Sequence, residues 1–211
     1  AKSNPKKYTR YLKKHQKYYN NKNLIAVSKG AEIGILNSAR VKPKSICTIY
    51  NPFDFVKIRK LSSEKISVIP KEDYIIHAAR FDLPHKRQDI LLDAFTKIKS
   101  NCKLVLLTEP CDELNKLIRK FKIQNKVIIS GFKNNPYPWF KNAKLTVLCS
   151  DFEAFGNVIV ESLICGTPVI STDCISGPNE ILTDNMANWL VPTGDADALA
   201  QKIDQILGYP E

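Results

Sequence analysis

Short, continuously apolar runs alternate along the chain with stretches of helical periodicity. The runs predict strands at residues 24–28, 46–50, 74–79, 103–108, 127–130, 145–149, 168–172 and 189–191. Between them, apolar residues recur at spacings of three and four, as Leu114, Leu117, Ile118 and Phe121 do. Because the strand runs do not alternate with polar residues, we expect both faces of the sheet to be covered. Strand, helix and strand in succession then predict an α/β fold with a doubly wound parallel sheet.

The alternation breaks at residues 51–71, where prolines and serines replace the apolar periodicity. The two strands and two helices predicted before the break are too few for an independent core. We therefore expect residues 1–50 to be the tail of a preceding N-terminal domain, residues 51–73 to be a linker with a short helix, and residues 74–211 to be the main domain. The chain opens without Met or an apolar signal region, so we expect the natural protein to extend further upstream.

Composition excludes several classes of protein. No apolar run approaches the roughly 20 residues that a membrane-spanning helix needs. The six cysteines are scattered through apolar segments and none stands in a C-x-x-C pair. This argues against a zinc site or a disulfide framework, and it favours small buried side chains in a reducing cytoplasm.

The formal net charge of +11 favours polyanions, anionic lipid surfaces or phosphorylated ligands as partners. The excess is concentrated in residues 1–44, where Glu32 is the only acidic residue. Tyrosines lie among these lysines, a mixture found where aromatic rings stack on bases or sit at a membrane interface. A solvated helix that packs on the preceding domain is the simpler interpretation. Of the two polyanions, we expect an anionic membrane surface rather than nucleic acid.

Candidate chemistry follows the first strand of the main domain. In open parallel sheets, ligands bind beyond the carboxyl ends of the strands. Arg80 follows the run 74–79, and Lys86 and Arg87 precede a helix predicted at residues 88–100. Amides at a helix N-terminus favour an anion, and Arg and Lys suit the oxygens of a diphosphate. On local composition alone, a solvated basic loop is the simpler interpretation.

Two acids follow the run 145–149. Glu153 lies in the loop before a helix predicted from about Asn157 to Cys165, and Glu161 lies on that helix. Their separation along the helix axis is roughly 7 Å, so one carboxylate could reach a sugar beyond the phosphates and the other a ribose. Glu153 could instead be an acid that favours the helix dipole. Glu161 has apolar neighbours, and a half-buried acid requires a partner.

A third turn follows the run 168–172. Ser176 is placed to cap a helix that begins near Pro178. The amides of this turn could face the same ligand as the two preceding loops. An ordinary capped helix is the alternative interpretation.

Several of these segments together resemble a known family. Glu153-x7-Glu161, Cys165-Gly166-Thr167-Pro168 and Gly177-Pro178-x-Glu180 are similar, in this order, to the donor-site signature of retaining glycosyltransferases of family 4. The resemblance extends over residues 24–207 and includes Ala26–Lys29, Ile49–Asp54, Ala79–Phe81 with Lys86, and Ser130–Phe132. The family has the GT-B fold, in which two Rossmann-like domains face each other across a cleft. The resemblance therefore implies a Rossmann-like donor-binding half with a remnant of the N-terminal domain.

The resemblance also implies roles for individual residues. Arg80 and Lys86 would bind the donor diphosphate and stabilise the departing nucleotide without a metal or cofactor. Glu153 would contact the donor sugar, and with those two cations it forms the expected catalytic set. The other expected donor-binding residues are Gly131 and Phe132 near the base, Phe155, Gly156 and Asn157 near the phosphates and sugar, and Glu161 at the ribose. Ala79, Arg87 and Ala154 stand where the family usually has Gly, which alters the expected loop geometry.

We therefore expect a fragment of a bacterial glycosyltransferase that binds a UDP-hexose or UDP-N-acetylhexosamine and serves lipopolysaccharide, capsule or other surface glycan synthesis. The acceptor, a glycan or a lipid-linked molecule, would bind through the N-terminal domain, so the isolated chain should bind donor without transferring it. We expect a cytoplasmic protein, with a peripheral position at the inner face of the membrane as a further option. The alternatives are a nucleotide-sugar epimerase of GT-B fold and a basic module that binds polyanions or membranes.

Overall fold

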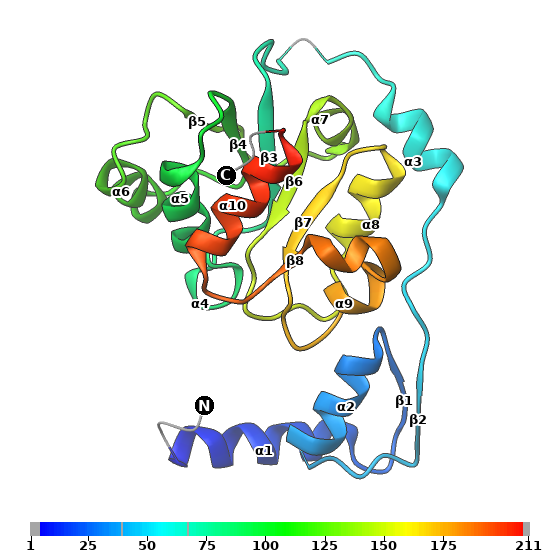
Figure 1. The fold of residues 1–211 in the computed structure, drawn as a ribbon. Coiled ribbons are helices and arrows are strands. Elements are labelled where there is room, and N and C mark those ends of the chain that lie inside the picture. The colour runs from blue at the N-terminus through cyan, green and yellow to red at the C-terminus, as the bar shows by residue number, and fades with distance from the viewer. Residues whose placement is uncertain (1–4, 39, 67, 209–211) are drawn as a thin grey trace.

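A computed structural model gives the fold and describes residues 5–38, 40–66 and 68–208. Its larger part is a six-stranded sheet in which all neighbouring strands are parallel (Figure 1). In spatial order the strands are β5 (Val127–Ile129), β4 (Lys103–Leu107), β3 (Tyr74–Ala78), β6 (Leu145–Leu148), β7 (Val169–Thr172) and β8 (Leu190–Val191). The chain starts in the middle at β3, winds outward to β5, crosses back to β6 and winds outward to β8. The doubly wound sheet is confirmed, and its switch point lies between β3 and β6.

Helices cover both faces of this sheet. On one face lie α5 (Gln88–Lys97), α6 (Asp112–Lys120) and α10 (Ala196–Ile206), and on the other lie α3 (Phe55–Ser62), α7 (Tyr137–Asn142) and α8 (Asn157–Ile164). Successive residues of β3 point to opposite faces and are both buried. Ile75 belongs to the same core cluster as Phe95 of α5, and Ile76 to the same cluster as Trp139 of α7. Burial on two faces is the reason why the strands are apolar throughout.

Short helical segments lie in the loops that follow the strands. They are α4 (Leu83–Lys86) after β3, α9 (Pro178–Ile181) after β7, and the 3-10 helix η1 (Asp184–Trp189) before β8. In Figure 1, α4 and α9 lie at the end of the domain that faces the N-terminal elements. The loops beyond the carboxyl ends of the strands therefore look toward the first part of the chain.

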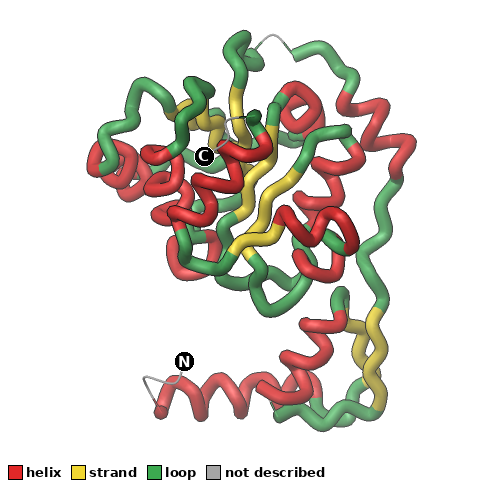
Figure 2. Tube along the Cα trace, viewed as in Figure 1, coloured by secondary structure: helices red, strands yellow, loops and turns green. Residues whose placement is uncertain are grey.

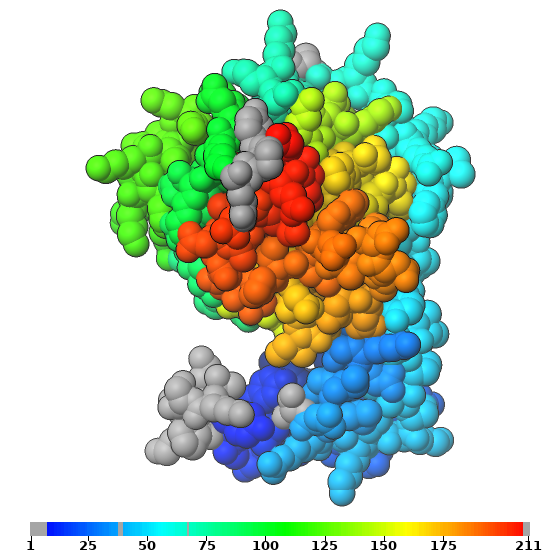
Figure 3. Space-filling view, viewed as in Figure 1, coloured from blue at the N-terminus to red at the C-terminus, as the bar shows by residue number. Residues whose placement is uncertain are grey.

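The first part of the chain forms a separate unit with its own small sheet. Its elements are α1 (Pro5–Tyr19), β1 (Asn23–Ala26), α2 (Lys29–Ser38) and β2 (Ser45–Thr48), and β1 pairs with β2 in parallel. Figure 3 shows α2 against the larger domain, and in Figure 1 α1 lies farther from it than α2 does. The division at residues 1–50, 51–73 and 74–211 stays a prediction, and its ends at residues 1–4 and 209–211 lie outside the described residues.

The connection between the two sheets is an extended loop followed by a helix (Figure 2). The chain leaves β2 at Thr48 and enters α3 at Phe55, where the Asp54 side chain accepts a hydrogen bond from the Lys57 amide at 2.9 Å. This N-cap confirms the short helix expected in the linker. Helix α7 was not predicted, because it is only six residues long and has Pro138 in its first turn.

Candidate functional site

The loop after β3 carries the predicted phosphate-binding cations. The Arg80 side chain is 74% exposed, and its guanidinium donates from Nε and Nη2 to Oδ2 of Asp82 at 3.1 and 2.8 Å. His85 Nδ1 lies 2.9 Å from Oδ1 of the same carboxylate. The hydrogen bonds from His85 and then Arg80 lower the pKa of Asp82. Asp82 therefore holds the guanidinium from one side and leaves its other N–H groups available.

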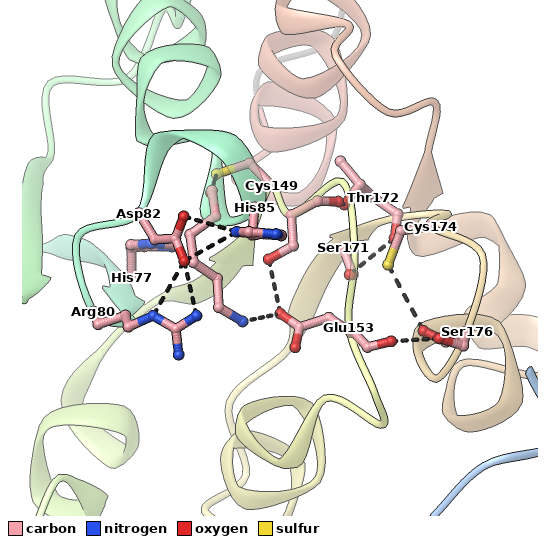
Figure 4. A network of polar contacts seen from close by, with 12 residues as sticks. His77, Arg80, Asp82, His85, Cys149, Glu153, Ser171, Thr172, Cys174 and Ser176 are labelled. Carbon is pink, nitrogen blue, oxygen red and sulfur yellow. Dashed lines mark hydrogen bonds and ion pairs between the residues drawn. The ribbon is translucent and has the colours of Figure 1, made fainter. Parts of the chain in front are cut away.

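The second cation of this loop pairs with the predicted sugar-binding acid. Lys86 Nζ donates to Glu153 Oε1 at 2.6 Å, and the Ser150 hydroxyl donates to the same oxygen at 2.7 Å. The two charged side chains are only 19% and 12% exposed. In Figure 4, Arg80, Asp82 and His85 lie on one side of Glu153 and Ser176 on the other. Charge-assisted hydrogen bonds of this length between largely buried side chains are among the stronger polar contacts in proteins.

Ser176 does not cap α9, contrary to the sequence prediction. The N-cap position belongs to Gly177, which has φ +90° and ψ −70°. The Ser176 hydroxyl instead donates to the backbone carbonyl of Glu153, and the Ser28 hydroxyl donates to the carbonyl of Ala154 at 2.6 Å. Two serines from distant parts of the chain thus hold the backbone of the loop that carries Glu153.

Glu180 joins the first part of the chain to the larger domain. Its carboxylate accepts hydrogen bonds from the amides of Lys29 and Gly30 at 2.8 and 2.9 Å, at the first turn of α2, and from the Tyr50 hydroxyl at 3.0 Å. Burial opposes ionisation of this carboxyl, but the hydrogen bonds from Gly30 and Lys29 outweigh it and lower its pKa. A carboxylate at a helix N-terminus is also favoured by the helix dipole. This contact fixes α2 beside the loop that Ser28 and Ser176 hold.

Two cavities meet at Arg80 and contain the four predicted charged groups. A cavity of about 620 Å³ is lined by Arg80, Glu161 and Phe132 among mostly apolar residues. A second cavity of about 390 Å³ is lined by Arg80, Lys86, Glu153, Phe155, Gly156 and Asn157, together with Asn51 and Val27. The two also share Ala78, Ala79 and Val158. Stretches far apart in the sequence therefore build one continuous site.

Glu161 occupies the apolar end of this site. It is half-buried, and desolvation raises its pKa. Among the described residues its carboxylate makes no hydrogen bond or ion pair. A carboxylate that is desolvated without a protein partner can accept a hydrogen bond from a bound ligand, such as one from a hydroxyl group.

Other predicted residues take different positions. Phe132 lines the larger cavity and is 70% exposed, and its amide donates to Glu109 at 3.2 Å. Gly131 lies next to it, but neither cavity includes it among its lining residues. Phe155 lines the smaller cavity, and its ring packs 5.6 Å from the Tyr50 ring, centroid to centroid. The predicted roles of all these residues stay predictions.

The structure also explains one departure from the family pattern. Arg87 stands where the family usually has Gly, and its backbone is left-handed, with φ +49° and ψ +47°. This conformation is unfavourable for a residue with a side chain. The Arg87 guanidinium offsets the cost by pairing with Asp89 at 3.0 Å and Asp151 at 2.8 Å. The turn that presents Lys86 is therefore kept without a glycine.

Sequence reasoning missed several residues of the site. Ser150 and Glu109 each lie just beyond a strand end, a position that could have singled them out. Asn51 lines the smaller cavity and donates to Asn157 at 2.7 Å, across 106 residues, which no local pattern signals. None of the helices in the described ranges is long and apolar enough to span a bilayer. The described His, Cys, Asp and Glu side chains also form no group of three suited to a metal ion.

Comparison with known proteins identifies the family of this chain. Residues 59–211 match the family model described as glycosyl transferases group 1. This chain belongs to that glycosyltransferase family. It is 31% identical over 186 residues to the N-acetylgalactosamine-N,N'-diacetylbacillosaminyl-diphospho-undecaprenol 4-alpha-N-acetylgalactosaminyltransferase of Campylobacter jejuni, a match that covers 87% of this chain and 50% of the relative. It is 29% identical to the lipopolysaccharide 1,6-galactosyltransferase of Escherichia coli, covering 87% of this chain and 52% of that one. The chain thus spans about half the length of the curated relatives it matches.

Two solved structures share the fold of this chain. Anabaena HepE in complex with UDP and glucose superposes with a TM-score of 0.77 over 93% of this chain and 57% of HepE, at 24% identity. The HepE complex with UDP-glucose superposes with a TM-score of 0.71 over 87% of this chain and 53% of HepE, at 25% identity. The expected Rossmann-like sheet, one half of a GT-B fold, is confirmed.

Proposed function

We propose that this chain binds a nucleoside-diphosphate sugar in the two joined cavities, and that the whole protein transfers the sugar to a glycan or lipid-linked acceptor. The observation that carries the proposal is the meeting of Arg80, Lys86, Glu153 and Glu161 around one continuous site. Two cations, Arg80 at the junction of the cavities and Lys86 in the smaller one, suit a diphosphate. One acid at each end suits the hydroxyl groups of a sugar and of a ribose.

The cations can bind phosphate while keeping their present contacts. An ammonium has three N–H groups, and Lys86 uses one of them on Glu153. The guanidinium of Arg80 has five, of which Asp82 engages two. A diphosphate between them would therefore gain two positive charges without breaking either ion pair. As the bond between the anomeric carbon and the diphosphate breaks, these charges stabilise the departing group.

The proposed reaction is the one that the family resemblance implies. The acceptor oxygen bonds the anomeric carbon on the face that the diphosphate leaves, so the anomeric configuration is retained, and the proton of the acceptor hydroxyl passes to the departing phosphate oxygen. We expect no metal or cofactor to be required, so EDTA should leave transfer unchanged. The names of the relatives and the UDP complexes of HepE support a UDP-hexose or UDP-N-acetylhexosamine donor for surface glycan synthesis. This chain alone should bind donor with negligible transfer.

Glu161→Gln tests the site, because it should strengthen folding and weaken donor binding. A carboxyl whose pKa is raised in the folded state is disfavoured there when ionised. Glu161 therefore costs no stability at a pH below its pKa in the unfolded chain. The stability falls as the pH rises through the pKa of Glu161 in the folded state, and it stays reduced at pH 7. The amide removes this penalty, so the variant should melt higher than wild type at pH 7. UDP affinity should fall at least about tenfold, because a hydrogen bond to a charged group contributes about 1.5–3 kcal/mol.

Thermal unfolding at pH 4 and pH 7, with calorimetric titration of UDP, GDP and ADP, measures both effects. Glu113→Gln, on the outer helix α6, is the control and should change neither quantity appreciably. The assignment is wrong if none of the three nucleotides binds wild type better than the Glu161→Gln variant. In the full-length protein, product analysis distinguishes a new glycoside from the epimerised donor that a nucleotide-sugar epimerase would release.

We also propose that α1 binds an anionic membrane surface at the inner face of the cytoplasmic membrane. Rings of Tyr8, Tyr11, His15 and Tyr19 follow one another along the helix, with centroid separations of 6.4, 3.9 and 5.8 Å. The helix has no acidic residue between Pro5 and Tyr19. An aromatic stripe flanked by lysines is typical of helices that lie in the membrane interface.

Vesicle sedimentation tests this contact. The chain should bind phosphatidylglycerol vesicles and not phosphatidylcholine vesicles, and added salt should weaken the binding. Lys13→Glu with Lys17→Glu should reduce binding by more than about tenfold, since each basic residue near the surface contributes about 1 kcal/mol. The control pair Lys116→Glu and Lys120→Glu on α6 carries the same charge change. If both double variants lose vesicle binding equally, or if the chain binds DNA as well as vesicles, the binding depends on net charge alone and not on α1.

A further inference from the structure

A buried amide lies beneath the segment that carries both cations. Gln88, the first residue of α5, is fully buried and lines neither cavity. Its Nε2 donates to the backbone carbonyl of Arg80 at 2.9 Å, and its Oε1 accepts from the backbone amide of Asp82 at 3.2 Å. One side chain therefore bridges the backbone on both sides of Phe81. This contact sets the direction in which Arg80 and its partner Asp82 leave the loop.

His77 fixes which way the Gln88 amide faces. His77 lies on β3 and is buried, and desolvation lowers its pKa to about 4, so the imidazole is neutral. Its Nδ1 lies 2.9 Å from the carbonyl oxygen of Val147, which can only accept, so Nδ1 carries the hydrogen. Nε2 is then an acceptor, and it lies 3.3 Å from Nε2 of Gln88. Both N–H groups of the amide are thus used, and its oxygen must face Asp82.

A buried thiol contacts the backbone at the other end of the segment 80–87. Cys149, just beyond β6, is fully buried, and its Sγ lies 3.0 and 3.1 Å from the carbonyl oxygens of Lys86 and Arg87. Figure 4 shows Cys149 and His77 in the network with Arg80 and Glu153. The segment 80–87 is therefore anchored beneath both cations by Gln88 and Cys149, which line neither cavity, while His77 also lines the smaller one. Such outer contacts preserve the geometry that oriented ligand binding requires.

We propose that Gln88 is a positioning residue for the donor diphosphate, acting through the backbone of Arg80 and Asp82. The inference rests on the proposed function. With an apolar side chain at this position, the Arg80 carbonyl and the Asp82 amide lose their buried partner and the loop turns toward water. The guanidinium then no longer faces the junction of the two cavities. Because the base and ribose bind elsewhere in the site, the loss should be confined to the diphosphate.

The affinity ratio of UDP to uridine measures this role. In NMR titrations of the 211-residue chain, Gln88→Met should bind UDP about tenfold or more weakly than wild type, with uridine affinity unchanged within about twofold, since about 1.4 kcal/mol corresponds to tenfold. Tyr74→Phe is the control. It removes one buried hydrogen bond, from the Tyr74 hydroxyl to the Trp139 carbonyl, at the opposite end of β3. It should lower stability and leave the ratio unchanged.

The outcomes distinguish the positioning role of Gln88 from the proposed function. An unchanged ratio in Gln88→Met, or an equal loss of UDP and uridine, overturns the positioning role while the proposed function stands. Should that variant not fold, His77→Phe keeps the amide but removes the acceptor that orients it. A partial loss of the ratio is then expected, and an unchanged ratio overturns the proposal. If the wild-type chain binds UDP no more tightly than uridine, and GDP no more tightly than guanosine, the proposed function itself is wrong.

Discussion

Lys86→Met is expected to weaken UDP binding by about 100-fold or more and to destabilise the fold. The substitution removes a cation from the predicted diphosphate site. Lys86 has two N–H groups left for phosphate oxygens, and two hydrogen bonds from a charged group at about 1.5–3 kcal/mol each correspond to about 100-fold or more in affinity. The substitution also leaves the Glu153 carboxylate, only 12% exposed, with the Ser150 hydroxyl as its remaining side-chain partner among the described residues. Breaking a partly buried pair in this way should cost about 1–3 kcal/mol of stability. Calorimetry with UDP and thermal unfolding measure the two effects.

A double-mutant cycle separates binding from stability. Combining Lys86→Met with Glu153→Gln should recover part of the stability, because no buried charge is left unpaired, and should leave UDP binding weak. Lys97→Met is the matched control, since Lys97 also contacts two carboxylates, Asp93 at 3.3 Å and Asp197 at 2.8 Å, outside both cavities. UDP affinity within threefold of wild type in Lys86→Met would show that the Lys86–Glu153 pair serves stability alone.

Gly177→Ala should displace the loop that carries Glu153. Gly177 has φ +90° and ψ −70°, a conformation that side chains rarely adopt. A Cβ there would lie 2.1 Å from the carbonyl oxygen of Phe155. Backbone strain and overlap of about 1–3 kcal/mol each should lower the melting temperature by roughly 10 °C. UDP binding should fall with it, because the displaced backbone is the one that Ser176 and Ser28 hold.

Gly34→Ala is the control for this substitution. Gly34 lies within α2, and an added Cβ would meet no atom within 4 Å. Alanine should therefore leave UDP binding unchanged and stabilise the helix by up to about 1 kcal/mol. A melting temperature of Gly177→Ala within about 2 °C of wild type would mean that the loop relaxes freely, and the rigid support inferred for Glu153 would be wrong.

Local patterns failed where a contact joined distant segments. Ser176 has the residue type and spacing of a helix cap, yet it donates to the Glu153 carbonyl, because the unusual backbone of Gly177 begins the helix instead. Gln88 was predicted only as the start of a helix. Its amide is oriented by His77, and that imidazole is oriented by Val147, 70 residues away along the chain. The packing of α7 against α3 likewise depends on burial that a six-residue segment does not reveal.

The sequence by itself determined the order of the strands and of the longer helices between them, and the edge of the sheet at which the chemistry lies. Apolar runs that are buried on both faces require a covered parallel sheet, and parallel strands end at one edge, so Arg80, Lys86 and Glu153 had to emerge there. The tertiary structure alone decided how these groups are aimed. Hydrogen bonds are directional and short, so the orientation of each side chain depends on partners that only the folded chain brings within about 3 Å.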